Sequence, residues 1–138
     1  MKGKTMGRIL LIDDDPDIRF VARLALKRGK HEVTAVEGGA AALALLDQGL
    51  EPDLVLCDSM MPEMNGVQTL LALRARPRFA TTPFAFLSAK AQPAEVEQGL
   101  KLGACRYLTK PFEPHELLGA VNAILAEFAP GAAGAKAP

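Results

Sequence analysis

The sequence predicts an α/β protein in which helices cover both faces of a five-stranded parallel sheet. Five short apolar runs alternate with five helical patterns along the chain. The runs lack a strict alternation of apolar and polar residues, which is typical of strands buried on both faces. The helical patterns between them supply the crossovers that parallel strands require. With 138 residues the chain has the size of one doubly wound domain.

Each predicted strand is followed by its helix. The strands are residues 8–13, 32–36, 53–58, 83–88 and 106–109, and the helices are residues 16–28, 38–49, 66–76, 93–103 and 114–128. Asp15 suits the cap of the first helix, with Pro16 at its first position. Pro93 and Pro114 open the fourth and fifth helices in the same way. Gly103 is well placed to end the fourth helix.

The last helix and the two ends of the chain complete the domain. Leu117, Val121, Ile124 and Phe128 recur at helical spacing, so we expect an apolar stripe along the last helix. Residues 129–138 are small residues with prolines, which cannot bury enough surface to order themselves. We therefore expect a folded domain over residues 8–128, a flexible lead over residues 1–7 and a disordered tail.

Composition narrows the function classes. Lysine plus arginine and aspartate plus glutamate both count 16, and no basic run stands out, so direct nucleic-acid binding is disfavoured. Cys57 and Cys105 match no metal or redox spacing and are expected to be small buried hydrophobic residues. The sequence shows no signal-peptide core and no membrane span, so we expect a cytoplasmic protein without a membrane partner.

Charged and polar residues stand where the predicted strands end. They are Asp13, Asp14 and Asp15 after the first strand, Asp58 after the third, Ser88 after the fourth, and Lys110 with Pro111 after the fifth. In an open parallel sheet, ligands bind at the carboxyl ends of the strands, where the strand order reverses. If the order is 2-1-3-4-5, Asp13, Asp14 and Asp58 meet in one pocket. Such an oxygen-rich site suits Mg²⁺, whose remaining positions can hold a phosphoryl oxygen.

The sequence resembles the receiver domain of two-component response regulators from Arg8 to about Phe128. The resemblance rests on four motifs, which are LLIDDDPDIR, DLVLCDSMMPEMNG, FLSAK and GACRYLTKPFEP. It implies a flavodoxin-like fold with strand order 2-1-3-4-5. Departures from the family pattern are small. Ser88 stands where threonine is equally usual, and Asn65 replaces a commoner aspartate at a position that suits a tight turn.

The resemblance implies a chemical role for each acidic residue of the pocket. Asp58 would be the phosphoacceptor, attacking a phosphoryl group carried by a histidine kinase. Asp13, Asp14 and Asp58, with the backbone carbonyl of Met60, would hold Mg²⁺. Asp15 is assigned to the helix cap instead. The plain alternatives are a loop-capping aspartate at position 58 and a solvated turn at positions 13 and 14.

The remaining site residues have roles implied by the same resemblance. The Lys110–Pro111 bond is a candidate for the cis form, with the Lys110 ammonium reaching Asp58. Ser88 would donate its hydroxyl to a phosphoryl oxygen, and Tyr107 would be the switch aromatic. The alternatives are an exposed loop lysine, a helix-capping serine and a half-buried core tyrosine.

Two residues bear on how long a phosphoryl group would last. In receivers the side chains two residues after the acceptor and two after the hydroxyl flank the approach of water, and here they are Met60 and Lys90. Neither orients a water, so we expect slow self-dephosphorylation. His31 and His115 match no site position, and we expect both to be solvated.

The resemblance also implies partners. We expect a phosphoaccepting regulator rather than an enzyme proper, in the form of a stand-alone receiver. Its partners would be a sensor histidine kinase or phosphotransfer protein, and a downstream protein docking on the face of the fourth helix, fifth strand and fifth helix. The receiver would be a monomer or a weak phosphorylation-dependent dimer. The alternatives are a phosphohydrolase, which usually places an acid where Met60 stands, and a docking module, which would not need to retain Asp14, Asp58, Ser88 and Lys110.

Overall fold

Five parallel strands form one sheet in the order β2-β1-β3-β4-β5, seen in a computed structural model that describes residues 7–89 and 92–128. The strands are β1 (Arg8–Ile12), β2 (Glu32–Val36), β3 (Leu54–Asp58), β4 (Phe84–Ser88) and β5 (Arg106–Thr109). The predicted fold class and strand order are therefore confirmed. The central strands β3 and β4 are buried along their whole length, as their apolar runs predict, whereas the edge strands are only partly buried.

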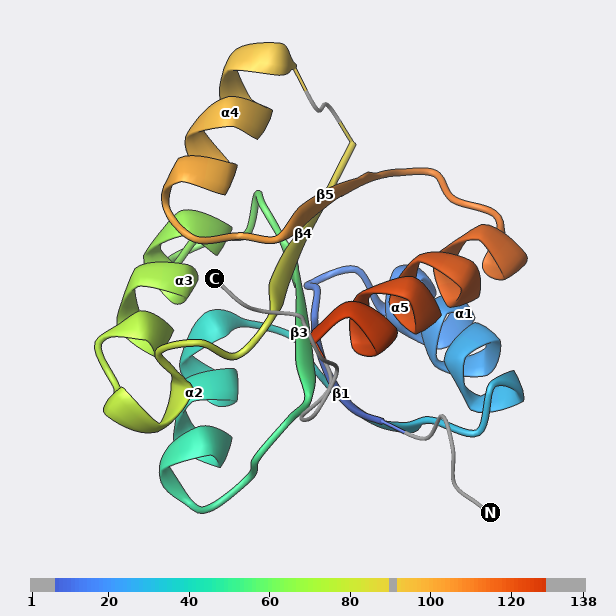
Figure 1. Cartoon of the computed structure of the whole chain (residues 1–138), viewed down its shortest axis with the longest axis horizontal. Helices are drawn as coiled ribbons and strands as arrows, with labels where there is room; N and C mark the ends of the chain where they lie inside the picture. The colour runs from blue at the N-terminus through green and yellow to red at the C-terminus, as the bar shows by residue number, and fades with distance from the viewer. Residues whose placement is uncertain (1–6, 90–91, 129–138) are drawn as a thin grey trace.

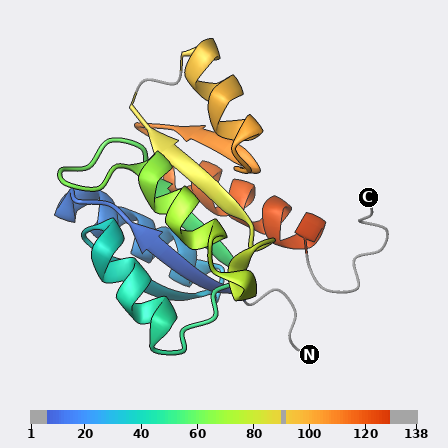
Figure 2. The ribbon, with the colours of Figure 1, turned by 90° about the vertical axis from the view of Figure 1, so that its left-hand side faces the viewer.

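Helices cover both faces of the sheet (Figure 1, Figure 2). Against one face lie α1 (Pro16–Arg28) and α5 (Pro114–Phe128), which pack on each other. On the other side are α2 (Gly39–Asp47), α3 (Gly66–Arg74), the short 3₁₀ helix η1 (Pro77–Phe79) and α4 (Pro93–Lys101). Each face buries its own apolar cluster, and together the two clusters form the core.

The helix ends follow the local sequence signals. The Asp15 carboxylate accepts a hydrogen bond from the Asp17 amide at 2.9 Å, with proline at the start of α1. Pro93 and Pro114 open α4 and α5. Gly103 follows α4 with a φ of 115°, a left-handed conformation that glycine adopts without strain. The predicted starts of α1, α4 and α5 are confirmed, whereas α2, α3 and α4 each end two residues before the predicted end.

The apolar stripe of α5 is shorter than predicted. Leu117, Val121 and Ile124 are buried against the sheet and α1, but Phe128 is 44% exposed. Phe128 is the last residue of the helix and lies beyond the residues that pack against this cluster. The prediction that it belongs to the stripe is wrong.

His31 is buried, so the prediction that it is solvated is wrong, whereas His115 is exposed as expected. The Gly7 amide lies 3.0 Å from His31 Nδ1, and Asn122 Oδ1 lies 2.7 Å from His31 Nε2. Because an amide N–H only donates, Nδ1 is the acceptor, and Nε2 carries the proton donated to Asn122. The imidazole thus joins the start of β1 to α5, two segments far apart in sequence.

This contact also moves the boundary of the folded domain. Gly7, which we assigned to the flexible lead, is buried and packs beside Leu125. The rest of that lead, residues 1–6, and the predicted tail, residues 129–138, lie outside the described residues.

Candidate functional site

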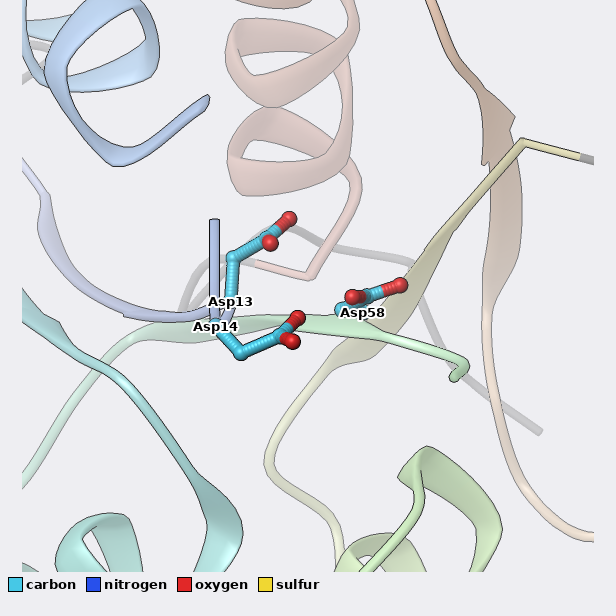
Figure 3. Close-up of side chains that lie close together, drawn as sticks. All are labelled: Asp13, Asp14 and Asp58. Atoms are coloured by element: carbon cyan, nitrogen blue, oxygen red, sulfur yellow. The ribbon is translucent and has the colours of Figure 1, made fainter. Parts of the chain in front are cut away.

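Three carboxylates meet at the carboxyl edge of the sheet. Asp13 and Asp14 follow β1 directly, and Asp58 is the last residue of β3. The two strands are neighbours, with Ile12 opposite Cys57, so their ends lie side by side. Carboxylate oxygens of the three aspartates lie within 4.8 Å of one another, and the side chains point toward a common space (Figure 3). The sequence predicts that these three aspartates share one pocket, and the structure brings them together.

Asp13 is fully buried, and its loop is fixed by several hydrogen bonds. Its Oδ1 accepts from the Asp15 amide at 3.0 Å, and its own amide donates to the Val36 carbonyl at 3.1 Å. The Arg19 guanidinium donates to the Asp13 carbonyl at 2.7 Å. The contact of Arg19 was not predicted from the sequence. Its position four residues after the helix cap Asp15, one helical turn along from the acidic loop, is nevertheless a signal that an arginine can reach that loop.

Lys110 brings a positive charge into this cluster. Its Nζ lies 2.8 Å from Asp13 Oδ2 and 3.4 Å from Asp58 Oδ1. The Lys110–Pro111 peptide bond is cis, and the Lys110 amide donates to the Ser88 carbonyl at 2.8 Å. The lysine therefore reaches Asp58 as expected, but its closer contact is with Asp13.

The crowding of charges shifts two pKa values. Burial raises the pKa of the Asp58 carboxyl to about 6, and the Asp13 charge adds to the shift against the opposing effects of the Met60 amide and Lys110. For the Lys110 ammonium, burial alone lowers the pKa, but the hydrogen bond and charge of Asp13, together with Asp58, outweigh it and raise the pKa. The cluster therefore favours the charged form of Lys110 but opposes the charged form of Asp58.

The chemistry of these donors fits a divalent cation. Asp13, Asp14 and Asp58 offer only carboxylate oxygens, the ligands that Mg²⁺ prefers. Asp13 Oδ2 is buried, and its close partner among the described residues is the Lys110 ammonium, 2.8 Å away. Three carboxylates facing one ammonium leave an excess of negative charge that a cation would neutralise.

The other predicted site residues lie at different distances from this cluster. The Met60 amide donates to Asp58 Oδ1 at 3.2 Å, whereas the Met60 side chain is 75% exposed. Ser88 ends β4 beside β3 and is buried at the same edge of the sheet. Tyr107 is half-buried on β5, where its ring packs against Phe86, and it belongs to the apolar cluster of that face rather than to the pocket.

Two further expectations concern the loops around the site. Lys90 lies outside the described residues. Asn65, which we interpreted as a turn residue, instead caps α3, because its side chain accepts from the Gln68 amide and the Gln68 side chain accepts from the Asn65 amide. The spacing of asparagine and glutamine three residues apart was the signal for this capping box.

Comparison with known protein families identifies the family to which this fold and acidic pocket belong. Residues 9–122 match the response regulator receiver domain, which covers most of the chain. The chain belongs to the receiver domains of two-component response regulators. The receiver fold and the acidic pocket at its carboxyl edge therefore serve phosphoacceptor signalling in a two-component system.

Curated relatives of this receiver include regulators of two sizes. It is 40% identical over 120 residues to the transcriptional regulatory protein CpxR of Escherichia coli strain K12, covering 87% of this chain and 50% of CpxR. It is 36% identical over 124 residues to protein PilG of Pseudomonas aeruginosa, covering 89% of this chain and 90% of PilG. The chain thus spans about half the length of CpxR but nearly all of PilG.

Solved structures confirm the fold of the receiver. The chemotaxis response regulator CheY4 of Vibrio cholerae superposes with a TM-score of 0.81 at 31% identity, covering 88% of this chain and 100% of CheY4. The Mn²⁺-bound form of response regulator Rcp1 superposes with a TM-score of 0.73 at 26% identity, covering 87% of this chain and 92% of Rcp1. None of the described helices is both long and apolar enough to cross a membrane.

Proposed function

We propose that Asp58 accepts a phosphoryl group from the phosphohistidine of a sensor histidine kinase or phosphotransfer protein, in a reaction that depends on Mg²⁺. The observation that supports this most directly is the meeting of Asp13, Asp14 and Asp58 with Lys110 at one edge of the sheet. Among the acidic residues of the pocket, Asp58 alone is both nearly buried and contacted by two donors at one oxygen.

The chemistry is a nucleophilic displacement at phosphorus. An ionised Asp58 oxygen forms the new bond to phosphorus as the bond from phosphorus to the histidine nitrogen breaks, and that nitrogen keeps the electron pair. With a pKa of about 6, the Asp58 carboxyl is largely ionised at neutral pH. The Met60 amide and the Lys110 ammonium both approach Oδ1, which orients the carboxylate for attack.

Asp13, Asp14 and Asp58 would hold the divalent cation, with the backbone carbonyl of Met60. A bound Mg²⁺ neutralises negative charge on the phosphoryl oxygens. The Mn²⁺-bound Rcp1, a receiver relative, supports a divalent cation at this fold. Lys110 acts beside the cation as a second positive group, and Ser88 donates its hydroxyl to a phosphoryl oxygen.

Phosphorylation of Asp58 changes a surface of the receiver that lies away from the acidic pocket. The contact of the phosphoryl group with Ser88 draws that side chain toward Asp58, and the Tyr107 ring turns inward, which changes the face formed by α4, β5 and α5. A downstream protein docks on this face. Two arrangements that differ by a few kcal/mol are enough for such a response. The receiver works in the cytoplasm without direct nucleic-acid contact, as a monomer or a weak phosphorylation-dependent dimer.

Phosphorylation in vitro tests the acceptor. The receiver is incubated with acetyl phosphate, or with a phosphorylated kinase, in Mg²⁺ and in excess chelator, and its intact mass is measured. We expect one added phosphoryl group in Mg²⁺, none in chelator and none for Asp58→Asn. Asp17→Asn, which changes an exposed aspartate of α1, is the matched control and should be labelled like the wild type. Equal labelling of Asp58→Asn, or labelling unaffected by chelator, would show that the proposal is wrong.

A further inference from the structure

A buried glycine lies in the last turn of α4. Gly99 has helical neighbours on both sides, and glycine at such a position is less favourable than alanine by about 1 kcal/mol. A Cβ atom at position 99 would lie 2.6 Å from Cε2 of Tyr107, closer than carbon atoms pack. Only glycine therefore lets the Tyr107 ring rest directly on the backbone of α4.

The same point joins three elements of the receiver. The Tyr107 ring of β5 packs on the Phe86 ring of β4, with centroids 5.0 Å apart and ring planes tilted by 34°. The Phe86 ring edge is itself 3.2 Å from where a Cβ of residue 99 would lie. The Tyr107 ring is thus packed closely against both the Phe86 ring and the backbone of α4 at Gly99.

We propose that Gly99 is a positioning residue that lets the Tyr107 ring rest on α4 in the unmodified receiver, so that movement of the ring couples the Asp58 pocket to α4. This inference rests on the proposed function, because it assumes that a phosphoryl group at Asp58 moves the ring. The inference adds that Gly99 is the position on α4 through which the movement of the ring is transmitted.

A methyl group at position 99 should bias the switch. The methyl group would lie 2.6 Å from the half-buried Tyr107 ring and 3.2 Å from the fully buried Phe86 ring. Because the Tyr107 ring is the nearer and the less buried of the two, we expect Gly99→Ala to displace it from this position. The unmodified arrangement is then less favoured, and the arrangement selected by a phosphoryl group is more favoured. By linkage, a substitution on α4 tightens binding of a phosphoryl analogue at the acidic pocket.

The experiment titrates beryllium fluoride, a phosphoryl analogue, into the receiver in Mg²⁺. Tyr107 is the single tyrosine and the chain has no tryptophan, so intrinsic tyrosine fluorescence reports the ring alone. We expect the half-saturating concentration to be about threefold to tenfold lower for Gly99→Ala than for the wild type. Gly119→Ala is the matched control, because Gly119 lies in α5 and a Cβ there would meet no atom within 4 Å. It should leave the titration unchanged.

Two further variants identify the ring as the cause. In Tyr107→Leu the aromatic ring is absent, so adding Gly99→Ala to it should no longer change the half-saturating concentration, measured here by amide NMR shifts. An unchanged or higher concentration for Gly99→Ala, an effect that persists without the ring, or failure of Gly99→Ala to fold would overturn the inference.

The outcomes also separate this inference from the proposed function. A wild-type receiver that is phosphorylated at Asp58, with Gly99→Ala titrating like the wild type, shows that only the role of Gly99 is wrong. A wild-type receiver that neither becomes phosphorylated nor responds to beryllium fluoride shows that the proposed function is wrong, and the role of Gly99 is then wrong with it.

Discussion

Asp58 is a residue whose folded surroundings oppose its charge. Burial and the neighbouring Asp13 raise the pKa of its carboxyl from 3.8 to about 6. The folded protein therefore binds this proton more tightly than the unfolded chain does. The stabilising contribution of Asp58 is fully present below about pH 4 and is lost as the pH rises through about 6. At neutral pH the nucleophile is maintained at the expense of stability.

Removal of this charge should stabilise the metal-free receiver. We expect Asp58→Asn to raise the free energy of unfolding at pH 7 by about 1–2 kcal/mol, measured by urea denaturation in excess chelator. The gain should shrink as the pH falls from 7 to 4, because the wild-type carboxyl becomes protonated. Asp17→Asn, at an exposed position, should show no such pH-dependent difference. A loss of stability for Asp58→Asn at pH 7 would contradict the prediction.

Met60 bears on the lifetime of the phosphoryl group. Its amide contacts Asp58 while its side chain stands exposed beside the pocket, where it orients no water. We expect Met60→Asn to shorten the phosphoryl lifetime severalfold, on the order of 1 kcal/mol in the barrier, as measured by loss of label in Mg²⁺. Glu63→Gln, an exposed change in the same loop, is the control. Equal decay of the wild type and Met60→Asn would mean that only the backbone of Met60 matters.

Single elements were the part of the structure most open to prediction. Strand runs, proline at helix starts and Gly103 after α4 act over a few residues, so the sequence alone carries them. Contacts between distant elements leave no such local pattern in the sequence. In the sequence, His31 is a single polar residue between a predicted helix and a predicted strand, and its hydrogen-bond partner Asn122 lies 91 residues further along the chain.

The two histidines provide a paired test of this contact. We expect His31→Ala to lower the free energy of unfolding by about 2 kcal/mol, because it removes a buried ring and leaves the Gly7 amide without its acceptor. His115→Ala, at an exposed position on α5, should change it by less than about 0.5 kcal/mol.

A double-mutant cycle isolates the link to α5. Asn122→Ala should be the milder change, and His31→Ala combined with Asn122→Ala should cost less than the sum of the two. Additive effects would show that the ring is buried by packing alone. Equal destabilisation by His31→Ala and His115→Ala would show that the contact contributes nothing.

Across the whole molecule, the place of the site was predictable but its contacts were not. Parallel strands with helical crossovers put polar strand ends at one edge of the sheet, so the sequence pattern alone predicts that Asp13, Asp14 and Asp58 meet there, as they do in the structure. The order of the Lys110 contacts, with Asp13 closer than Asp58, depends on the distances between the ends of β1, β3 and β5. Those distances follow from packing and have no signature in a single sequence.

Metal binding should be visible in the stability of the whole fold. A cation that binds only the folded state raises the unfolding free energy, by about 1.4 kcal/mol at ten times its dissociation constant. We expect Mg²⁺ to raise the unfolding temperature of the wild type and not that of Asp13→Asn. Potassium chloride at matched ionic strength is the control for screening. An equal rise in Asp13→Asn, or with potassium chloride, would argue against a specific site.

The buried His31 contact lies at the amino edge of the sheet, where β1 and β2 begin, and the acidic pocket lies at the opposite edge. Substitutions at sites that share no partners usually add independently. We therefore expect the stability lost through the crowded carboxylates to be recoverable by changes at the amino edge, with signal output left intact. Directed evolution of such a receiver would then find its compensating mutations at one end of the sheet and its tuning mutations at the other.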